Sequence, residues 1–158
     1  PDIIAFGKKA QVCGMLVSKR VEEVKQNVFT ESSRINSTFG GNLTDMVRFQ
    51  LILEIITNEN LLKNASEMGN ILLKGLQDLT IEYPAFVTNP RGVGLFAAFD
   101  LPSSTERNNL INKLMENKLM ILPSGDQSVR FRPHLNVTEE DLNLALDIVH
   151  TSLRSVLN

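Results

Sequence analysis

Two adjacent lysines near the start of the chain directly follow an apolar segment. Lys8 and Lys9 come after Gly7 and the run Ile3–Phe6, whose composition predicts a buried strand. In open α/β sheets, ligands bind beyond the carboxyl ends of strands, so an amine at this place is a candidate for ligand binding or catalysis. The alternative is that both side chains are solvated in a loop, as most lysines are.

A second candidate segment, residues 37–42, combines hydroxyl side chains with two glycines just before a predicted helix. Hydroxyls and free backbone N–H groups at the start of a helix suit a phosphate group. The same segment could instead cap the helix through Thr38 or Asn42. The surrounding polar loop, residues 30–42, is long for a connection inside a compact domain, and loops of this length are often functional.

The third candidate segment is Val129–Pro133, in which arginines and apolar residues alternate. The alternation places Arg130 and Arg132 on one face of a predicted strand, opposite Val129 and Phe131. A planar guanidinium there could bind a carboxylate through two parallel hydrogen bonds. The alternative is an ordinary polar strand face.

The remaining motifs predict structure rather than chemistry. Gly92 and Gly94 lack the third glycine of a dinucleotide-binding fingerprint and precede a predicted strand, so we expect a turn there. His134 and His150 are expected to be structural or exposed, and two histidines offer little for a metal site. The single cysteine, Cys13, excludes an internal disulfide and a cysteine-cluster zinc site, and it fits a reducing compartment.

The elements that would position these segments are mostly helical. Residues 43–58 predict a helix that is apolar on nearly all sides, which suggests burial on two sides. The other predicted elements are a helix from 59 or 60 to about 79, a strand at 94–101, a helix that begins with a Ser103–Glu106 capping box, strands at 119–122 and 128–132, and a final helix capped by Thr138. We therefore expect two domains, residues 1–59 and 60–158.

Composition narrows the classes of protein to consider. With 42% hydrophobic and 22% charged residues, the chain is typical of a globular protein and not of a disordered one. The formal net charge of −2 argues against nucleic acid or acidic lipid as a partner. No apolar run approaches the ~20 residues of a membrane span. We therefore expect a cytoplasmic protein whose partners are small molecules.

Four segments, taken together, resemble the class III or ω-amino-acid aminotransferases, which are pyridoxal-phosphate enzymes of fold type I. These segments are residues 1–8, 37–42, 91–95 and 130–133, in the order and approximate spacing of that family. Residues 5–14 and 34–48 are more narrowly similar to the branch that acts on L-lysine. The 4-aminobutyrate branch shares Lys8–Lys9 and Arg130–Pro133. The resemblance covers all 158 residues but only roughly the C-terminal third of such an enzyme, so we expect a fragment of a longer protein.

The resemblance implies an α+β fragment of an α/β PLP-dependent transferase. Residues 1–59 would be the end of the PLP-binding large domain with an interdomain helix, and residues 60–158 the small C-terminal α+β domain. Lys8 would form the internal aldimine with pyridoxal 5′-phosphate and shuttle the proton during transfer. Thr38 and the backbone of Ser37 would bind the cofactor phosphate of the partner subunit in a homodimer. Arg130 would bind the α-carboxylate of the substrate.

The activity implied by the resemblance is transfer of the ε-amino group of L-lysine to 2-oxoglutarate by a ping-pong route, giving 2-aminoadipate 6-semialdehyde and glutamate. Transfer from 4-aminobutyrate or ornithine is the alternative. In the family, the remaining cofactor ligands lie N-terminal to the lysine, so we expect little or no activity from this chain alone. A non-catalytic α+β association domain is the alternative for the fragment. The roles of Lys9, Asn36 and Arg132 stay open.

Overall fold

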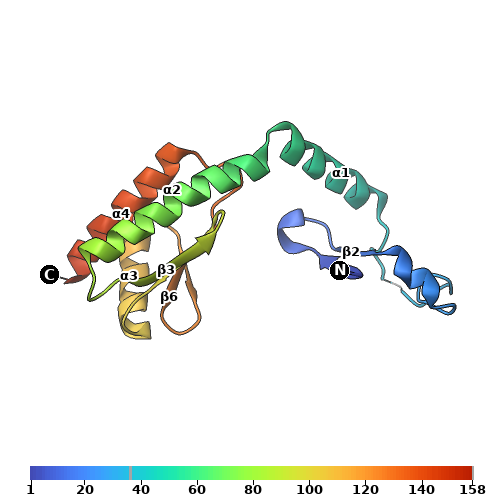
Figure 1. Cartoon of the computed structure of the whole chain (residues 1–158), viewed down its shortest axis with the longest axis horizontal. Helices are drawn as coiled ribbons and strands as arrows, with labels where there is room; N and C mark the ends of the chain where they lie inside the picture. Colours follow the sequence, from blue (N-terminus) through green and yellow to red (C-terminus); the bar gives the residue numbers. More distant parts are fainter. Residues whose placement is uncertain (36, 158) are drawn as a thin grey trace. The chain divides into compact units, whose positions relative to one another are not determined.

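The computed structural model describes residues 1–35 and 37–157 of the chain, which form two compact units (Figure 1). Unit 1 comprises Pro1–Glu59 and unit 2 comprises Asn60–Asn158. Within the described residues, no helix combines the length and the apolar character that crossing a membrane requires.

Unit 1 consists of a β-hairpin, two short 3₁₀ helices and one long α-helix. Strands β1 (Ile3–Phe6) and β2 (Gly14–Val17) pair antiparallel, with Phe6 opposite Gly14. The 3₁₀ helix η1 (Lys8–Ala10) lies in the hairpin loop, and η2 (Lys19–Glu23) follows β2. Helix α1 (Leu43–Asn58) has the predicted bounds, and the side chain of Asn42 caps it by accepting the Thr44 N–H at 2.9 Å.

The predicted burial of unit 1 was wrong. Ile3–Phe6 forms a strand, but Ile3 is 66% exposed. Helix α1 was expected to be buried on two sides, yet it has no buried residue, and Leu43 is 76% exposed. The apolar pattern shows which side chains of these elements could be buried. Burial also requires packing partners, and the described residues of unit 1 do not supply them.

Unit 2 is a four-stranded antiparallel sheet with three helices. Along the chain its elements are α2 (Leu61–Glu82), β3 (Thr88–Val93), β4 (Phe96–Asp100), α3 (Ser104–Glu116), β5 (Leu122–Ser124), β6 (Ser128–Phe131) and α4 (Glu139–Leu157). The strand order is β3-β4-β6-β5. Alternate residues of β4 and β6 point into the core, where Phe99 and Val129 are fully buried between the sheet and the helices.

Unit 2 differs from the sequence-based expectation at two strands. Strand β5 covers Leu122–Ser124 and not residues 119–122, so it begins about three residues later than predicted. Strand β3 was not predicted, and Gly92, which we assigned to a turn, lies inside it. The turn falls instead at Gly94 and Leu95, so β4 begins at Phe96 and not at residue 94. Strand β3 was missed because the segment Asn89-Pro90-Arg91 has no apolar alternation. The pairing of β3 with β4 is also irregular there.

Leu62 of α2 and Met115 of α3 are exposed, although each is next to a core residue in its helix. Leu62 is 74% exposed because its neighbour Leu61 faces the core instead, and Met115 is 51% exposed one position beyond the buried Leu114. One residue corresponds to about 100° of rotation around a helix, which is enough to turn a side chain away from the core.

Both predicted caps in unit 2 are confirmed. The Ser103 hydroxyl accepts the N–H groups of Thr105 and Glu106, so Ser103 is the N-cap, and the Glu106 carboxylate accepts a hydrogen bond from that hydroxyl. Before α4, the Thr138 hydroxyl accepts the Asp141 N–H at 3.2 Å and donates to its carboxylate at 2.7 Å. The Thr138 backbone N–H also donates to the Asp141 carboxylate, at 3.1 Å, and the two hydrogen bonds that this carboxylate accepts lower its pKa.

Candidate functional site

Lys8 stands immediately beyond the carboxyl end of β1. Its backbone has φ of 53°, in the left-handed region that residues other than glycine rarely adopt. The turn is closed by the Gln11 N–H, which donates to the Lys8 carbonyl at 2.9 Å. The Lys8 side chain is exposed. Such backbone geometry costs free energy and is frequent at functional sites, so it supports Lys8 as a candidate.

Strand β1, which ends at Phe6 two residues before Lys8, is packed against helix α1. The Phe6 and Phe49 rings stack with centroids 4.9 Å apart. Gly14, opposite Phe6 in the hairpin, leaves room for this ring, since a Cβ at Gly14 would overlap it. The loop of the hairpin is therefore anchored on both sides, and the position of Lys8 is set by packing as well as by its own turn.

The segment 37–42 forms a turn, and its capping role belongs to Asn42 and not to Thr38. The Gly40 N–H donates to the Ser37 carbonyl at 3.2 Å, and Gly41 has φ of 74°, which favours glycine. Gly40 also leaves space for the Ser37 hydroxyl, since a Cβ there would lie 2.8 Å from that oxygen. Ser37 and Thr38 are exposed, so their polar groups are accessible to a ligand.

A cavity of about 280 Å³ in unit 1 lies between the hairpin, the 37–42 turn and α1. The hairpin contributes Phe6 and residues 12–14, the turn contributes residues 39–42, and α1 contributes Asp45, Met46 and Phe49. Lys8, Ser37 and Thr38 flank this cavity in sequence but do not line it. The structure thus brings the two candidate segments of unit 1 to the same cavity.

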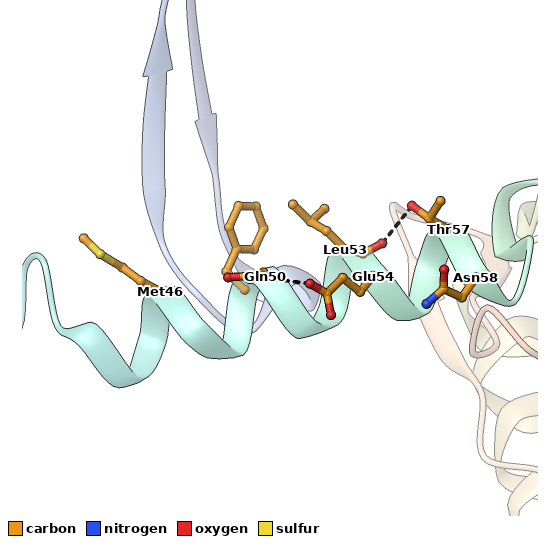
Figure 2. Close-up of a pocket in the computed structure, with 7 residues that line it drawn as sticks. Met46, Gln50, Leu53, Glu54, Thr57 and Asn58 are labelled. Carbon is orange, nitrogen blue, oxygen red and sulfur yellow. Dashed lines mark hydrogen bonds between the residues drawn. The ribbon is translucent and has the colours of Figure 1, made fainter.

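A larger cavity of about 410 Å³ follows α1 alone (Figure 2). Its polar groups are engaged within the helix. The Gln50 amide donates to the Glu54 carboxylate at 2.8 Å, and the Thr57 hydroxyl donates to the Leu53 carbonyl at 2.9 Å. Because every lining residue comes from this helix, no second element converges on the groove, and it is not a candidate catalytic site.

Arg130 lies on the sheet face of unit 2 that points away from the core. It is opposite Ala98 of β4 on one side and Leu122 of β5 on the other. Its Nε atom is buried and has no hydrogen-bond partner among the described residues. Arg132, two residues on, is exposed and lies 5.9 Å from the centroid of the Phe96 ring. An arginine with an unused donor suits an anionic ligand.

Next to Arg130 is a polar cluster that the sequence analysis did not identify. Asp100 is 8% exposed and accepts hydrogen bonds from the Ser128 hydroxyl at 2.5 Å, the Asn89 amide at 2.8 Å and the Arg91 guanidinium at 2.9 Å. Arg91 also donates to the Ser128 hydroxyl at 2.9 Å. Burial raises the pKa of Asp100, but these hydrogen bonds outweigh it and hold the pKa below its usual value.

One signal in the sequence could have indicated this cluster. Asp100 closes the apolar run Gly94–Phe99, and a carboxylate at the end of a buried strand requires partners. The identity of those partners could not be predicted, because Arg91 and Asn89 belong to the strand that the pattern did not show.

The other candidates contribute no chemistry to these sites. His134 hydrogen-bonds with Asn136 at 2.9 Å, and His150 hydrogen-bonds with Glu82 at 2.7 Å. The described residues contain no cluster of acidic, cysteine or histidine side chains that could hold a metal ion.

Asn36 and the side chain of Lys9 lie outside the described part of the chain. Lys8, Ser37 and Thr38 belong to unit 1, and Arg130 belongs to unit 2.

Known proteins resemble the chain over nearly its whole length. The family model described as Aminotransferase class-III matches residues 1–153. The L-lysine-epsilon aminotransferase of Mycobacterium tuberculosis is 48% identical over 153 residues, which cover 97% of this chain and 34% of that protein. The mitochondrial 4-aminobutyrate aminotransferase of Sus scrofa is 35% identical over 147 residues, which cover 93% and 28%.

A solved structure, that of lysine aminotransferase from M. tuberculosis in the internal aldimine form, superimposes with a TM-score of 0.93 at 47% identity. The superposition covers 99% of this chain and 36% of that one. The chain thus spans about a third of the length of the curated relatives that it matches.

Proposed function

The chain belongs to the class III aminotransferase family, and on this basis we propose that the whole protein transfers the ε-amino group of L-lysine to 2-oxoglutarate. Members of this family depend on pyridoxal 5′-phosphate, and the chain has the α+β fold of the corresponding third of these enzymes. The proposed products are 2-aminoadipate 6-semialdehyde and glutamate, formed by a ping-pong route.

The choice of lysine as the donor is supported by a difference in identity. The chain is 48% identical to an L-lysine-epsilon aminotransferase and 35% identical to a 4-aminobutyrate aminotransferase over similar lengths. The second donor, 4-aminobutyrate, is therefore the less favoured alternative. Ornithine remains an alternative on the sequence resemblance alone.

The residues present fit part of the cofactor. Lys8 offers an exposed primary amine for the aldehyde group, and residues 37–41 offer hydroxyls and backbone N–H groups for the phosphate. Bound pyridoxal phosphate supplies an electron sink for the carbon from which the amino group leaves. In this proposal Lys8 holds the cofactor covalently before the reaction and, once released, carries a proton on its Nζ atom.

The proposed site has contributions from two subunits. Thr38 and the backbone N–H of Ser37 bind the cofactor phosphate of the partner subunit in a homodimer. This proposal is supported by the exposure of both residues and by the assignment of helix capping to Asn42, which leaves Thr38 available. We also propose that residues 1–59 belong to the cofactor-binding domain and that residues 60–158 form the small domain.

Arg130 is proposed to bind the α-carboxylate of lysine and of 2-oxoglutarate in turn. The support is its buried Nε atom, which has no partner among the described residues. Recognition of the same carboxylate in both half-reactions lets one site serve donor and acceptor. We propose the cytoplasm as the location, with free Cys13 as the supporting observation, and small molecules rather than nucleic acid or membrane as ligands.

The test is a comparison of amino donors with the full-length protein. L-lysine, L-ornithine and 4-aminobutyrate are each assayed with 2-oxoglutarate, and we expect lysine to have the highest kcat/KM by about tenfold or more. A higher kcat/KM for 4-aminobutyrate would contradict the lysine assignment. The 158-residue chain assayed alone is expected to have little or no activity. A non-catalytic association domain would give the same result.

A further inference from the structure

The face of the sheet that carries Arg130 has a regular arrangement of facing residues. Ser128 and Arg130 alternate along β6, and the residues opposite them on β4 are Asp100 and Ala98. Asp100 is therefore diagonal to Arg130 on the same face. Among the described residues of strands β3 to β6, Asp100 is the only acid.

Asp100 is a potential competitor for the Arg130 guanidinium. Diagonal neighbours on paired strands are about 7–8 Å apart at the backbone, which a long side chain can bridge. Arg130 faces the small side chain of Ala98, so no bulky group stands between it and the Asp100 row. An aspartate and an arginine with an unused donor attract each other strongly where water is excluded.

The carboxylate of Asp100 is instead occupied by three other donors, two from β3 and one from β6. Arg91 of β3 donates to Oδ1 at 2.9 Å, Ser128 donates to the same atom at 2.5 Å, and Asn89 donates to Oδ2 at 2.8 Å. Arg91 is tied to the cluster by further bonds to the Ser128 hydroxyl and to the Asn89 carbonyl, both at 2.9 Å. The positive backbone φ of Asn89, 51°, belongs to the irregular stretch that lets β3 place both donors.

We propose that Arg91 is a positioning residue that holds Asp100 away from Arg130, so that the Arg130 guanidinium stays available for a substrate carboxylate. This inference rests on the proposed function, because it takes Arg130 as the carboxylate-binding group. Arg91 touches no substrate in this account and acts through Asp100.

The experiment compares variants of the full-length holoenzyme by their affinity for glutarate, an unreactive dicarboxylate, measured by titration calorimetry. Arg91→Gln frees Asp100, so its Kd for glutarate is expected to rise about tenfold or more. Adding Asp100→Asn removes the competing charge, and the double variant is expected to return to within about threefold of the original Kd. A rescue of this kind would not follow from a purely structural role of Arg91.

Three further variants complete the design. Arg91→Lys keeps the charge beside Asp100, and Arg154→Gln removes an exposed arginine of α4 elsewhere in unit 2, so both should leave the Kd within about threefold. Ser128→Ala removes one neutral donor and keeps every charge. It is expected to raise the Kd by about fivefold or more, above the range of both controls, so it decides the question if Arg91→Gln does not fold.

The outcomes separate this inference from the proposed function. An unchanged Kd in Arg91→Gln, or a raised Kd that Asp100→Asn does not restore, overturns the role of Arg91. In either case Arg130→Gln still tests the proposed function, because loss of the carboxylate-binding group must raise the Kd. If Arg130→Gln binds glutarate normally, the carboxylate role of Arg130 is wrong, and the role of Arg91 is wrong with it.

Discussion

Lys8 combines an unusual backbone conformation with an exposed amine. A left-handed φ at a residue other than glycine persists only where the surroundings enforce it. Here the Gln11 N–H closes the turn, and the stacked rings of Phe6 and Phe49 fix the strand that leads to it. The local fold therefore fixes the backbone of Lys8. Replacing each lysine of the pair in turn tests which amine binds the cofactor.

Replacement of Lys8 by alanine in the full-length protein is expected to abolish covalent attachment of pyridoxal phosphate, because it removes the amine that is proposed to bind the aldehyde group. The measurement is reduction with borohydride followed by peptide mapping with mass spectrometry. Lys9→Ala is the matched control and should keep the label on Lys8. A cofactor label that persists in Lys8→Ala and disappears in Lys9→Ala would show that the neighbouring lysine is the attachment site.

At the scale of elements, helix α2 approaches the β3–β4 turn closely. A Cβ at Gly69 would overlap the backbone of Gly94, a residue whose φ of 54° defines that turn. The contact is with backbone and cannot be relieved by rotation of a side chain. Gly75, further along the same helix, differs because a Cβ there would meet only the end of the Leu146 side chain.

Gly69→Ala is therefore expected to lower the free energy of unfolding by about 2 kcal/mol or more, since the helix or the turn must shift. Gly75→Ala is the control on the same helix. Its gain in helix propensity and the cost of moving Leu146 should leave it within about 1 kcal/mol of the original protein. Urea denaturation monitored by circular dichroism measures both, and equal effects would refute the close approach of α2 to the turn.

The elements also show what a single sequence can predict. The bounds of α1, the N-cap role of Ser103 and the inward face of β6 depend on local pattern, and all three are confirmed. Strand β3 could not be predicted, because Asn89-Pro90-Arg91-Gly92 has no alternation and its register is set by pairing with β4.

The same distinction applies to the candidate site. Lys8, Ser37, Thr38 and Arg130 are short-range features of motifs, so the sequence resemblance identified them as candidates, and their roles stay predictions. The Asp100 cluster joins residues of three strands, namely Asn89 and Arg91 of β3, Asp100 of β4 and Ser128 of β6. Only the sheet topology brings these residues together, and no local pattern encodes that topology.

At the scale of the whole chain, burial is divided unequally between the two units. Every buried residue among those described belongs to unit 2, whose core includes Leu72, Phe99 and Val149, each fully buried. Unit 1 has an aromatic stack and the two cavities described above but no buried side chain among its described residues. The free energy that opposes local opening must therefore be larger in unit 2.

Limited proteolysis of the 158-residue chain should reveal this inequality. We expect the first cuts within residues 1–59 and a resistant product that begins near Asn60, because cleavage requires local opening. Trypsin and chymotrypsin, which cleave after different residue types, should give the same order, with products identified by mass spectrometry. First cuts inside residues 60–158 would contradict the unequal stability of the two units.

The position of α4 in the core of unit 2 has a consequence for synthesis on the ribosome. Val149 and Leu153 complete that core, and β6 must be inserted between β4 and β5 to finish the sheet. Both events involve segments that follow α2 and the β3–β4 hairpin along the chain, so unit 2 cannot close until β6 and α4 have also left the exit tunnel. Until then, α2 and the β3–β4 hairpin present their apolar faces to the surrounding solution. Chaperones that shield nascent chains would therefore be needed at this unit until α4 emerges, even though it is the better packed of the two units when complete.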